Sequence, residues 1–390
     1  MVLTRHLIYL HPDRHDLRTP RRRVPTVQHR VIQWGTGNTG AHTLRFLLED
    51  PAFDVVGVWV NREQNVGRTA GELAGLATGG PSATHDVDAL VATAADCVVY
   101  MAAEPTGSPK EPGTDGWESV DTMCRLLASG KNVVATGISG LTNPRAFGGG
   151  VYDRLRLAAE SGGTTFFGTG IEPGFMCDAL ALSLSSISRD IRSIRAQESL
   201  SYATYDQPNY HVSHGGIWGA PCDPSFGDAF AEHILAAGMG GPVLLLAEAL
   251  GVTLDDLTAV VDLAAATEDF EVPMGPIGKD TVAGYRFELL GIIGGEARIA
   301  VEHITRIHPD VAPHWPSVGS GGFRVIVEGT PSFTAEVIFD EDDPTTAGCV
   351  ATAARVVNSI PTVCAAPSGV CSFLDLPVIS AAGSFGARLD

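Results

Sequence analysis

Long hydrophobic runs, paired cysteines and lysine are all scarce in this sequence of 390 residues. No stretch of about 18 uninterrupted apolar residues is present, so we expect neither a transmembrane helix nor a membrane partner. The seven cysteines are odd in number and form no C-x-x-C pair, which argues against a disulfide framework and favours a cytoplasmic protein. Apolar residues make up 44% of the chain, which at this length predicts a globular protein of two or more domains.

Positive charge is also scarce, except at the beginning of the chain. The formal net charge is −19, yet residues 1–26 contain six arginines. We interpret residues 1–26 as a basic N-terminal extension, because they lack the apolar core and small-residue cleavage site of a secretory signal. The acidic remainder makes nucleic acid an unexpected partner.

Short apolar runs alternate with helical stretches between residues 27 and 174. We predict strands at 30–34, 53–60, 96–101, 132–135 and 164–167, with helices between most of them. Such alternation is typical of βαβ units on a parallel sheet with helices on both faces. We therefore predict an α/β fold that begins with a dinucleotide-binding Rossmann domain over residues 27–174.

The pattern changes after residue 174. Runs with period-2 alternation at 193–201, 285–293, 297–307, 323–328 and 333–339 predict a largely antiparallel sheet with one polar face. Between them we expect a helical insert at about 224–266. These features predict an α+β substrate and dimerisation domain over residues 175–343, and the sheet face indicates a homodimer.

The end of the chain predicts one more helix. It covers residues 345–358 and should stop before Pro361, because the residue preceding proline usually leaves the helical region. We expect this helix, and the C-terminal segment 344–390 as a whole, to pack back on the Rossmann domain.

A glycine-rich turn joins the first predicted strand to its helix. In a G-x-G-x-x-G motif, the first glycine permits a tight turn, the second lets the backbone approach a pyrophosphate, and the third allows close packing of helix and strand. The start of the helix supplies free N–H groups for phosphates. The predicted cofactor-binding residues are Gly35, Thr36, Gly37, Asn38, Thr39 and Gly40.

The end of the second predicted strand bears on the kind of cofactor. An acidic residue there would bind the ribose 2′-hydroxyl of NAD, whereas arginine suits the 2′-phosphate of NADP. This chain has Asn61 and Arg62, with Glu63 close behind. We therefore predict that NADP(H) is preferred and that NAD(H) is possible.

A carboxylate follows the apolar run 98–103. Glu104 is placed to leave this buried strand at the carboxyl edge of the sheet, where ligands bind in such folds. In a dry site its pKa would rise unless a cation pairs with it, so it could act as a base or hold a substrate ammonium. From position alone, an exposed loop glutamate beside Pro105 is an equal alternative.

Two further segments predict the substrate pocket. Residues 168–175 lead from the last Rossmann strand into the second domain and should form one wall of the interdomain cleft. The stretch 202–218 is unusually rich in aromatic residues and histidine. Its two histidines have no identifiable third ligand, so we predict no metal site. The predicted pocket residues are Ile171, Tyr205, His211, His214 and Trp218.

Together these motifs resemble the dihydrodipicolinate reductase-like oxidoreductases, a group that includes 2,4-diaminopentanoate dehydrogenase and the native amine dehydrogenases. Dihydrodipicolinate reductase itself is excluded, because its catalytic signature with two histidines and a lysine has no counterpart here. The resemblance implies that Glu104 stands at the place of the catalytic glutamate of the amine dehydrogenases. It spans residues 31–376 and is carried by the glycine turn, segments 67–73 and 168–175, Glu104, and the closing segments 357–361 and 375–377.

The expected function is reversible reductive amination, in which a ketone or aldehyde and ammonia form an iminium ion that accepts hydride from the nicotinamide. The partners would be a small carbonyl compound or amine and ammonia. One alternative is an NADP-dependent carbonyl or imine reductase without ammonia chemistry, with Tyr205 or His211 as the proton donor. Another is a dinucleotide-binding sensor or scaffold without catalysis, since fold does not establish activity.

Overall fold

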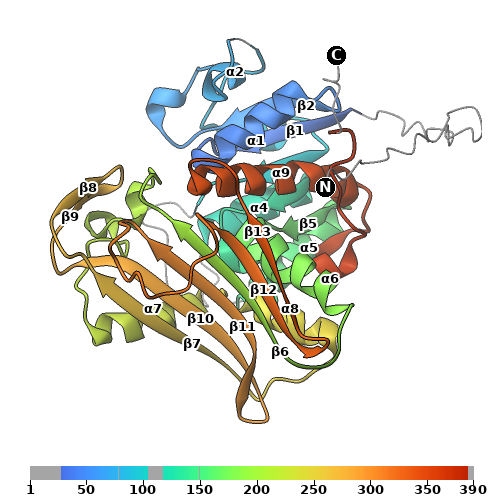
Figure 1. Ribbon diagram of the computed structural model, residues 1–390. Helices are drawn as coiled ribbons and strands as arrows, with labels where there is room; N and C mark the ends of the chain where they lie inside the picture. The colour runs from blue at the N-terminus through green and yellow to red at the C-terminus, as the bar shows by residue number, and fades with distance from the viewer. Residues whose placement is uncertain (1–27, 78, 104–116, 149, 385–390) are drawn as a thin grey trace, which may run out of the picture.

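Two six-stranded sheets organise the computed structural model, which describes residues 28–77, 79–103, 117–148 and 150–384 (Figure 1). The first sheet is entirely parallel and has the strand order β14-β5-β4-β3-β1-β2. Its strands are β1 (His29–Trp34), β2 (Phe53–Trp59), β3 (Cys97–Tyr100), β4 (Asn132–Ala135), β5 (Thr165–Gly168) and β14 (Gly369–Cys371).

Helices cover both faces of this parallel sheet. Along β3 every side chain is buried, and alternate residues pack into different layers: Val99 into the layer with α1 and α9, and Val98 into the layer with α4 and α5. The continuous apolar character of the strand follows from this burial on both sides. The helices are α1 (Asn38–Glu49), α4 (Glu118–Ala128), α5 (Val151–Gly162) and α9 (Pro344–Cys364), with the short α2 (Ala70–Leu73) and α3 (Val87–Ala92) beyond β2.

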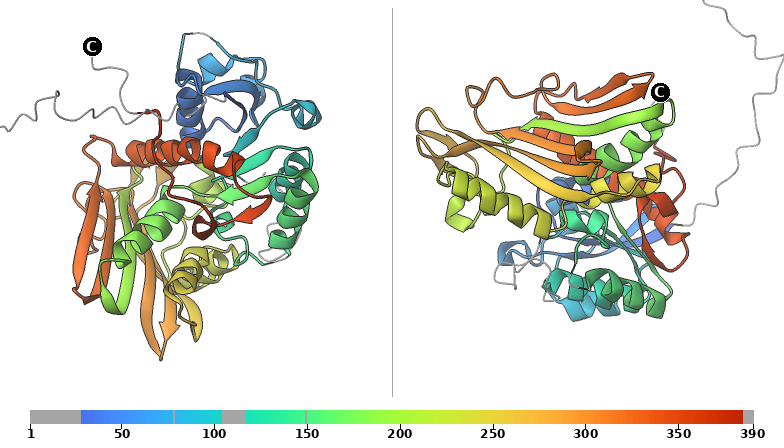
Figure 2. Two further views of the ribbon diagram at one scale, coloured as in Figure 1. Left: turned by 90° about the vertical axis from the view of Figure 1, so that its right-hand side faces the viewer. Right: turned by 90° about the horizontal axis from the view of Figure 1, so that it is seen from below.

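The second sheet is mixed and has the order β13-β12-β6-β11-β10-β7. All its pairs are antiparallel except β6 with β11. In Figure 2 this sheet forms an outer layer, with helices on the side toward the first domain. Its strands are β6 (Arg189–Ser201), β7 (Asp256–Ala265), β10 (Val282–Ile293), β11 (Glu296–Arg306), β12 (Gly322–Thr330) and β13 (Phe333–Ile338).

One face of the second sheet forms an apolar core with helices. Side chains of β6, β10 and β11 pack there with α6 (Ala181–Ser185), α7 (Pro224–Ala236) and α8 (Gly241–Leu250). A small hairpin, β8 (Phe270–Val272) with β9 (Gly275–Ile277), follows β7. The opposite face carries charged and polar side chains, as period-2 alternation requires for a sheet with one covered face.

The final helix returns to the first domain. In Figure 1, α9 lies beside α1 and crosses the parallel sheet; it contacts α1, β3, β4 and β5, and it also touches η4 (Ile171–Leu180) and β6. The predicted fold class, a Rossmann domain followed by a domain with a largely antiparallel sheet, is confirmed. The division of the chain at residues 26, 174 and 343 stays a prediction.

Two predicted elements are wrong in detail. The helical insert predicted through residue 266 ends earlier, because Asp256–Ala265 is strand β7 at the edge of the second sheet. The last helix does not stop before Pro361 but continues to Cys364. Ile360 and Val363, on either side of that proline, are fully buried against the parallel sheet, so packing outweighs the local preference.

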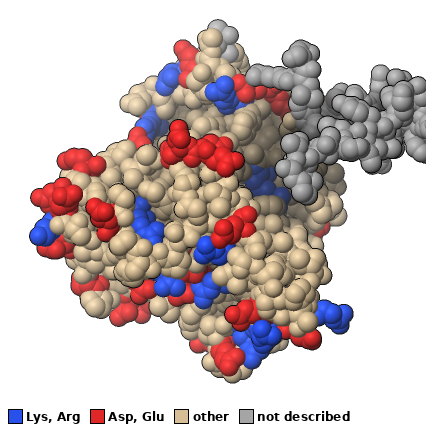
Figure 3. All heavy atoms as spheres, viewed as in Figure 1, with Lys and Arg blue, Asp and Glu red and all other residues tan. Residues whose placement is uncertain are grey.

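The distribution of charged side chains on the surface and the length of the helices bear on which partners are possible. Figure 3 shows acidic and basic side chains interspersed on the face in view. None of the helices in the described ranges is long and apolar enough to span a bilayer.

Candidate active site

The glycine turn between β1 and α1 is built from close backbone contacts. Gly35 has φ +95°, a conformation that favours glycine, and a Cβ there would lie 2.9 Å from the backbone nitrogen of Ala102. A Cβ on Gly40 would lie 2.3 Å from the carbonyl oxygen of Gly35. Both positions therefore require glycine for the turn itself, whatever it binds.

Gly37 differs from its two neighbours in the motif. It is the N-cap of α1, no side chain of the described residues caps this helix, and its first turn contains no acidic residue. A Cβ on Gly37 would meet no atom within 4 Å among the described residues. Free N–H groups beside open space at a helix N-terminus suit an anion such as a dinucleotide pyrophosphate. Thr36, Asn38 and Thr39 are partly buried around this space.

The predicted cofactor-selecting residues lie just beyond β2. Asn61 and Arg62 are both exposed and precede the short helical turn Glu63–Asn65. The side chain of Glu63 lies 3.3 Å from His85. Arg62 is thus available to a ligand at the carboxyl edge of the sheet.

The predicted catalytic residue, Glu104, lies outside the described residues. The chain that leads to it is described as far as Ala103, and Ala102 is packed between two glycines. Gly35 contacts it from the glycine turn, and a Cβ on Gly137, after β4, would lie 2.0 Å from its carbonyl oxygen. The segment before Glu104 therefore runs directly along the glycine turn.

A loop of the second domain closes over the glycine turn. The side-chain amide of Asn38 donates a 2.9 Å hydrogen bond to the carbonyl oxygen of Asp206. Tyr205, also in hydrogen-bond contact with Asn38, has its ring 5.3 Å from that of Tyr202 and 5.9 Å from that of Tyr210. Burial raises the pKa of the Tyr205 hydroxyl. Of the predicted pocket residues, Tyr205 thus lies beside the glycine turn.

The other predicted pocket residues are more dispersed. Ile171 is half-buried at the beginning of η4 (Ile171–Leu180), and its N–H donates to Thr352 of α9. His211 is buried with both ring nitrogens engaged, by Ser213 and by the carbonyl oxygen of Pro276. His214 is exposed.

Trp218 has a place in the core of the second domain. It is fully buried, and its ring centroid lies 5.0 Å from that of Tyr285. Its indole Nε1 has no hydrogen-bond partner among the described residues.

A buried cluster of three titratable side chains was not predicted. Glu172, Glu198 and His303 come from η4, β6 and β11, and their side chains are at most 6% exposed. Nδ1 of His303 lies 3.1 Å from Oε1 of Glu198 and 3.3 Å from Oε2 of Glu172. Tyr202 donates a 3.3 Å hydrogen bond to Glu198. The ring of Tyr202 therefore joins this cluster to the loop over the glycine turn.

The electrostatics of the cluster favour a protonated histidine. Burial lowers the pKa of His303, but the two carboxylates of Glu198 and Glu172 outweigh it and raise the pKa to about 10. Burial also raises the pKa of Glu198, against the influence of His303. The three ligand atoms lie within 4.8 Å of one another and could hold a metal ion, as an alternative to a proton shared between the histidine and the carboxylates.

The strand alternation contains a signal for this cluster. On β6, Ile194, Ala196 and Glu198 share one face, and on β11, Val301 and His303 share the same core face. A charged residue at a position where alternation predicts an apolar one indicates a functional or paired group. Glu172 lies within the predicted cleft segment 168–175, where the sequence predicts no individual role for it.

Comparison with known proteins identifies relatives over nearly the whole chain. Residues 175–386 match the family model of the 2,4-diaminopentanoate dehydrogenase C-terminal domain. An amine dehydrogenase of Streptomyces virginiae is 36% identical over 367 residues, which covers 92% of this chain and 99% of the relative. A 2,4-diaminopentanoate dehydrogenase of Acetoanaerobium sticklandii is 24% identical and covers 90% of this chain and 93% of the relative.

A solved structure agrees with the fold. An amine dehydrogenase from Mycobacterium smegmatis matches with a TM-score of 0.73 at 19% identity, over 90% of this chain and 97% of that one. The resemblance expected from the sequence motifs is thereby confirmed. The chain belongs to the oxidoreductase family that contains the amine dehydrogenases and 2,4-diaminopentanoate dehydrogenase.

Proposed function

We propose that this protein is a nicotinamide-dependent amine dehydrogenase that catalyses the reversible reductive amination of a small ketone or aldehyde. The observation that carries the proposal is the uncapped start of α1 at Gly37, open to a ligand and covered by the Tyr205 loop of the second domain. Its amine dehydrogenase relative is 36% identical. In the forward direction a carbonyl compound, ammonia, NAD(P)H and a proton give an amine, water and NAD(P)⁺.

Some residues of this chain would bind the cofactor and the substrate, and Glu104 would transfer protons. The bound dinucleotide supplies the hydride, and the helix start and glycine turn hold its phosphates. Glu104 is proposed to exchange protons with the ammonia-derived nitrogen and the departing water, and to stabilise the cationic iminium. The second domain would orient the carbonyl carbon and exclude bulk water.

The cofactor is proposed to be NADP(H) in preference to NAD(H). Asn61 and Arg62 are exposed beyond β2 and offer no carboxylate to the ribose 2′-hydroxyl. The guanidinium of Arg62 suits a 2′-phosphate. Glu63 is the nearest competing acidic group.

The alternative without ammonia chemistry is a carbonyl or imine reductase. It needs a proton donor such as Tyr205 or His211. Burial raises the pKa of Tyr205, and His211 already uses both ring nitrogens within the protein. These features favour Glu104 as the acid–base group.

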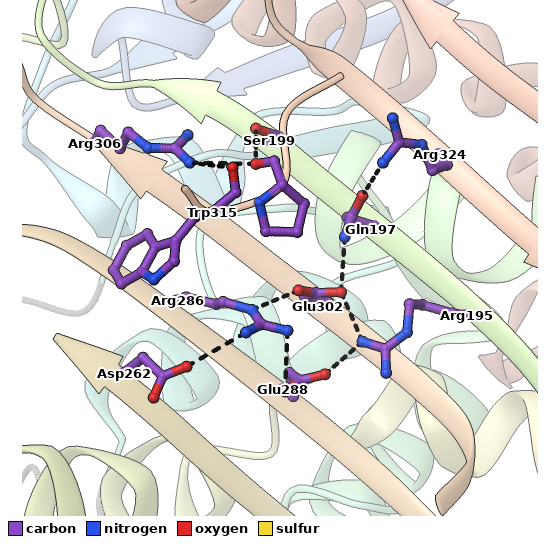
Figure 4. Close-up of polar contacts among 11 residues, drawn as sticks. Arg195, Gln197, Ser199, Asp262, Arg286, Glu288, Glu302, Arg306, Trp315 and Arg324 are labelled. Atoms are coloured by element: carbon purple, nitrogen blue, oxygen red, sulfur yellow. Dashed lines mark hydrogen bonds and ion pairs between the residues drawn. The ribbon is translucent and has the colours of Figure 1, made fainter. Parts of the chain in front are cut away.

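A homodimer and a cytoplasmic location are also proposed. The outer face of the second sheet carries a network of charged side chains rather than an apolar patch (Figure 4). Arg195, Arg286 and Glu288 of this network keep part of their surface exposed, so a second copy would meet a mixed, self-complementary charged face. Analytical ultracentrifugation at low and high salt tests this arrangement.

The catalytic proposal is tested by initial rates of nicotinamide oxidation on short ketones and aldehydes. NADPH and NADH are compared, with and without ammonium, for the natural protein and Glu104→Gln. Oxidation that requires ammonium and is lost in the variant is the expected result. Turnover that is independent of ammonium and survives Glu104→Gln would identify a carbonyl reductase. Cofactor binding without turnover of any compound would identify a sensor or scaffold.

A further inference from the structure

One ring nitrogen of His303 has no hydrogen-bond partner among the described residues. Nδ1 faces Glu172 and Glu198, whereas Nε2 is buried and has no hydrogen-bond partner in the part of the chain that the structure describes. Two carboxylates beside one imidazole favour the imidazolium form, in which Nε2 carries a proton and is a charged donor. A buried charged donor without an acceptor is costly. This atom therefore indicates a place for an acceptor that the described residues do not supply.

A second unpartnered polar atom lies on the same face of the same strand. Thr305 follows His303 by two positions on β11, so the two side chains point to one side of the sheet. Thr305 is fully buried, and its Oγ1 also has no partner within the described ranges. Thr305 is paired in the sheet with Tyr285, whose ring lies 5.5 Å from that of His303.

The indole Nε1 of Trp218 is a third buried polar atom without a partner among the described residues. The ring centroid of Trp218 lies 5.0 Å from that of Tyr285. Tyr285 is thus flanked by three residues that each hold a buried polar atom with no partner among the described residues. We call Nε2 of His303, Oγ1 of Thr305 and Nε1 of Trp218 the donor patch.

The donor patch is connected to the cofactor turn by aromatic side chains. The ring of Tyr202 lies 5.8 Å from that of His303 and 5.3 Å from that of Tyr205. Tyr205 in turn contacts Asn38 at the beginning of α1. Tyr202 and Tyr205 are only partly buried, so the cluster is approached from the side of the loop that covers the glycine turn.

We propose that the donor patch binds a neutral oxygen atom of the substrate, remote from the carbon that accepts the hydride. The inference rests on the proposed function and names its substrate class: a ketone that also carries a hydroxyl or ether oxygen, and the corresponding amino alcohol or amino ether. Each atom of the patch can donate a hydrogen bond, so the complementary group is an acceptor.

Charge selects a neutral acceptor over a carboxylate. Two carboxyl groups, those of Glu172 and Glu198, face the single imidazole of His303, so acidic groups outnumber basic ones in the buried cluster. A substrate carboxylate would add a further negative charge within this poorly solvated region, where repulsion is weakly screened. A hydroxyl or ether oxygen accepts the same hydrogen bond without that repulsion.

The test compares 2-hexanone with its two ether analogues, in which oxygen replaces the methylene at C4 or at C5, and with 4-oxopentanoate. We expect kcat/KM with NADPH and ammonium to be about tenfold higher for at least one ether than for 2-hexanone, and lowest for the carboxylate. Thr305→Val, which is isosteric and removes no internal hydrogen bond seen among the described residues, should reduce the ether-to-alkyl ratio. His303→Gln should reduce it further.

A matched control is Thr164→Val. Thr164 is also a buried threonine, but its hydroxyl bonds to the carbonyl oxygen of Leu127 at the amino end of β5, remote from the donor patch in sequence and fold. This change should leave the ether-to-alkyl ratio unaltered. The proposal would be overturned if kcat/KM for every ether equalled that for 2-hexanone, or if Thr305→Val left the ether-to-alkyl ratio of kcat/KM unchanged. A higher kcat/KM for 4-oxopentanoate than for the ethers would also overturn it.

Binding measurements separate this proposal from the catalytic one. Calorimetric dissociation constants of the same ketones, taken with the dinucleotide in its oxidised form, need no turnover. If no ammonium-dependent turnover is found, the amine dehydrogenase reaction is refuted. If an ether ketone nevertheless binds more tightly than 2-hexanone, and Thr305→Val weakens that binding, the donor patch is supported. Equal dissociation constants for ether and alkyl ketones would refute the donor patch.

Discussion

The side-chain amide of Asn38, in the glycine turn, donates a hydrogen bond to the carbonyl oxygen of Asp206, 168 residues further along the chain. The first residue belongs to the turn expected to hold the cofactor phosphates, and the second to the loop that carries Tyr202 and Tyr205. This bond ties the cofactor turn of the first domain to the pocket loop of the second. Occupancy of the turn and the position of the pocket loop are therefore physically connected.

Two motif glycines, Gly37 and Gly40, should respond differently to the addition of one methyl group. Gly37→Ala is expected to lower the melting temperature only slightly, because Gly37 has φ −71° and its Cβ would meet no described atom within 4 Å, so the main cost is the weaker N-cap preference of alanine. If that space receives the pyrophosphate, the dissociation constant for NADPH should rise by about tenfold or more. Isothermal calorimetry and a thermal melt measure the two effects.

Gly40→Ala is the matched control for that substitution. Its Cβ would lie 2.3 Å from the carbonyl oxygen of Gly35, so the turn itself must shift and the melting temperature should fall. Unaltered NADPH affinity in Gly37→Ala would show that the cofactor does not approach the backbone here.

The sequence predicts the first domain well because its signals are local. A buried parallel strand is a continuous apolar run, and the motif of the glycine turn after β1 consists of six consecutive residues. The edge strand β7 has no such signal: Asp256–Ala265 contains three alanines and two aspartates and lacks clear alternation. Its strand conformation comes from pairing with β10, which no local signal within the segment encodes.

The site is less predictable because it is assembled from distant residues. Glu198 and His303 are register partners on β6 and β11, and their meeting depends on a parallel pairing that alternation alone does not specify. Trp218, predicted as a pocket residue from the aromatic-rich loop, has its indole packed in the core of the second domain, and its place in the substrate pocket stays a prediction. The role of Glu104 stays a prediction.

The charged network on the outer face of the second sheet should contribute to stability through Glu302. This carboxylate is 1% exposed and lies 2.6 Å from guanidinium nitrogens of both Arg195 and Arg286 (Figure 4). Glu302→Gln should lower the free energy of unfolding by about 2 to 4 kcal/mol, since it removes one partner from a buried ion pair. Chemical denaturation monitored by fluorescence measures the loss.

Glu296→Gln provides the comparison for Glu302. Glu296 pairs with Arg298 at 2.9 Å on the same strand, but its side chain is 70% exposed, so its removal should cost less than about 1 kcal/mol. Equal losses in the two variants would contradict a special contribution of the buried network.

Cys364, at the end of α9, should be the most reactive thiol among the described cysteines. A hydrogen bond with Cys97 lowers its pKa to about 6, with a further contribution from His29, although burial acts in the opposite direction. Half-buried Cys222 has its pKa raised by burial and serves as the comparison. Iodoacetamide at pH 7 should alkylate Cys364 first, as followed by peptide mass spectrometry.

Removal of the hydrogen-bond partner gives the control for this thiol. Cys97→Ala should slow the alkylation of Cys364 by roughly tenfold at pH 7, because less of it is then thiolate. Labelling of Cys222 ahead of Cys364 would be incompatible with the lowered pKa.

The buried histidine should make stability depend on pH above neutrality. His303 faces Glu172 from η4, Glu198 from β6, and the rings of Tyr202 and of Tyr285 on β10, and its pKa in the folded protein is about 10. The unfolded chain releases this proton near pH 6.5. The folded state therefore binds more protons between these values, so the stabilisation is complete below pH 6.5 and is lost as the pH rises through 10.

The measurement is the difference in stability between the natural protein and His303→Gln at pH 7, 8 and 9. This difference should shrink by up to about 1.4 kcal/mol per pH unit, because the folded natural protein keeps a proton on His303 that its unfolded chain has released, and His303→Gln has no such proton. Taking the difference cancels the tyrosine, cysteine and lysine titrations that both proteins share. A difference that stays constant across this range would mean that His303 is already neutral at pH 7, and Nε2 would then be an acceptor rather than the donor that the substrate pocket requires.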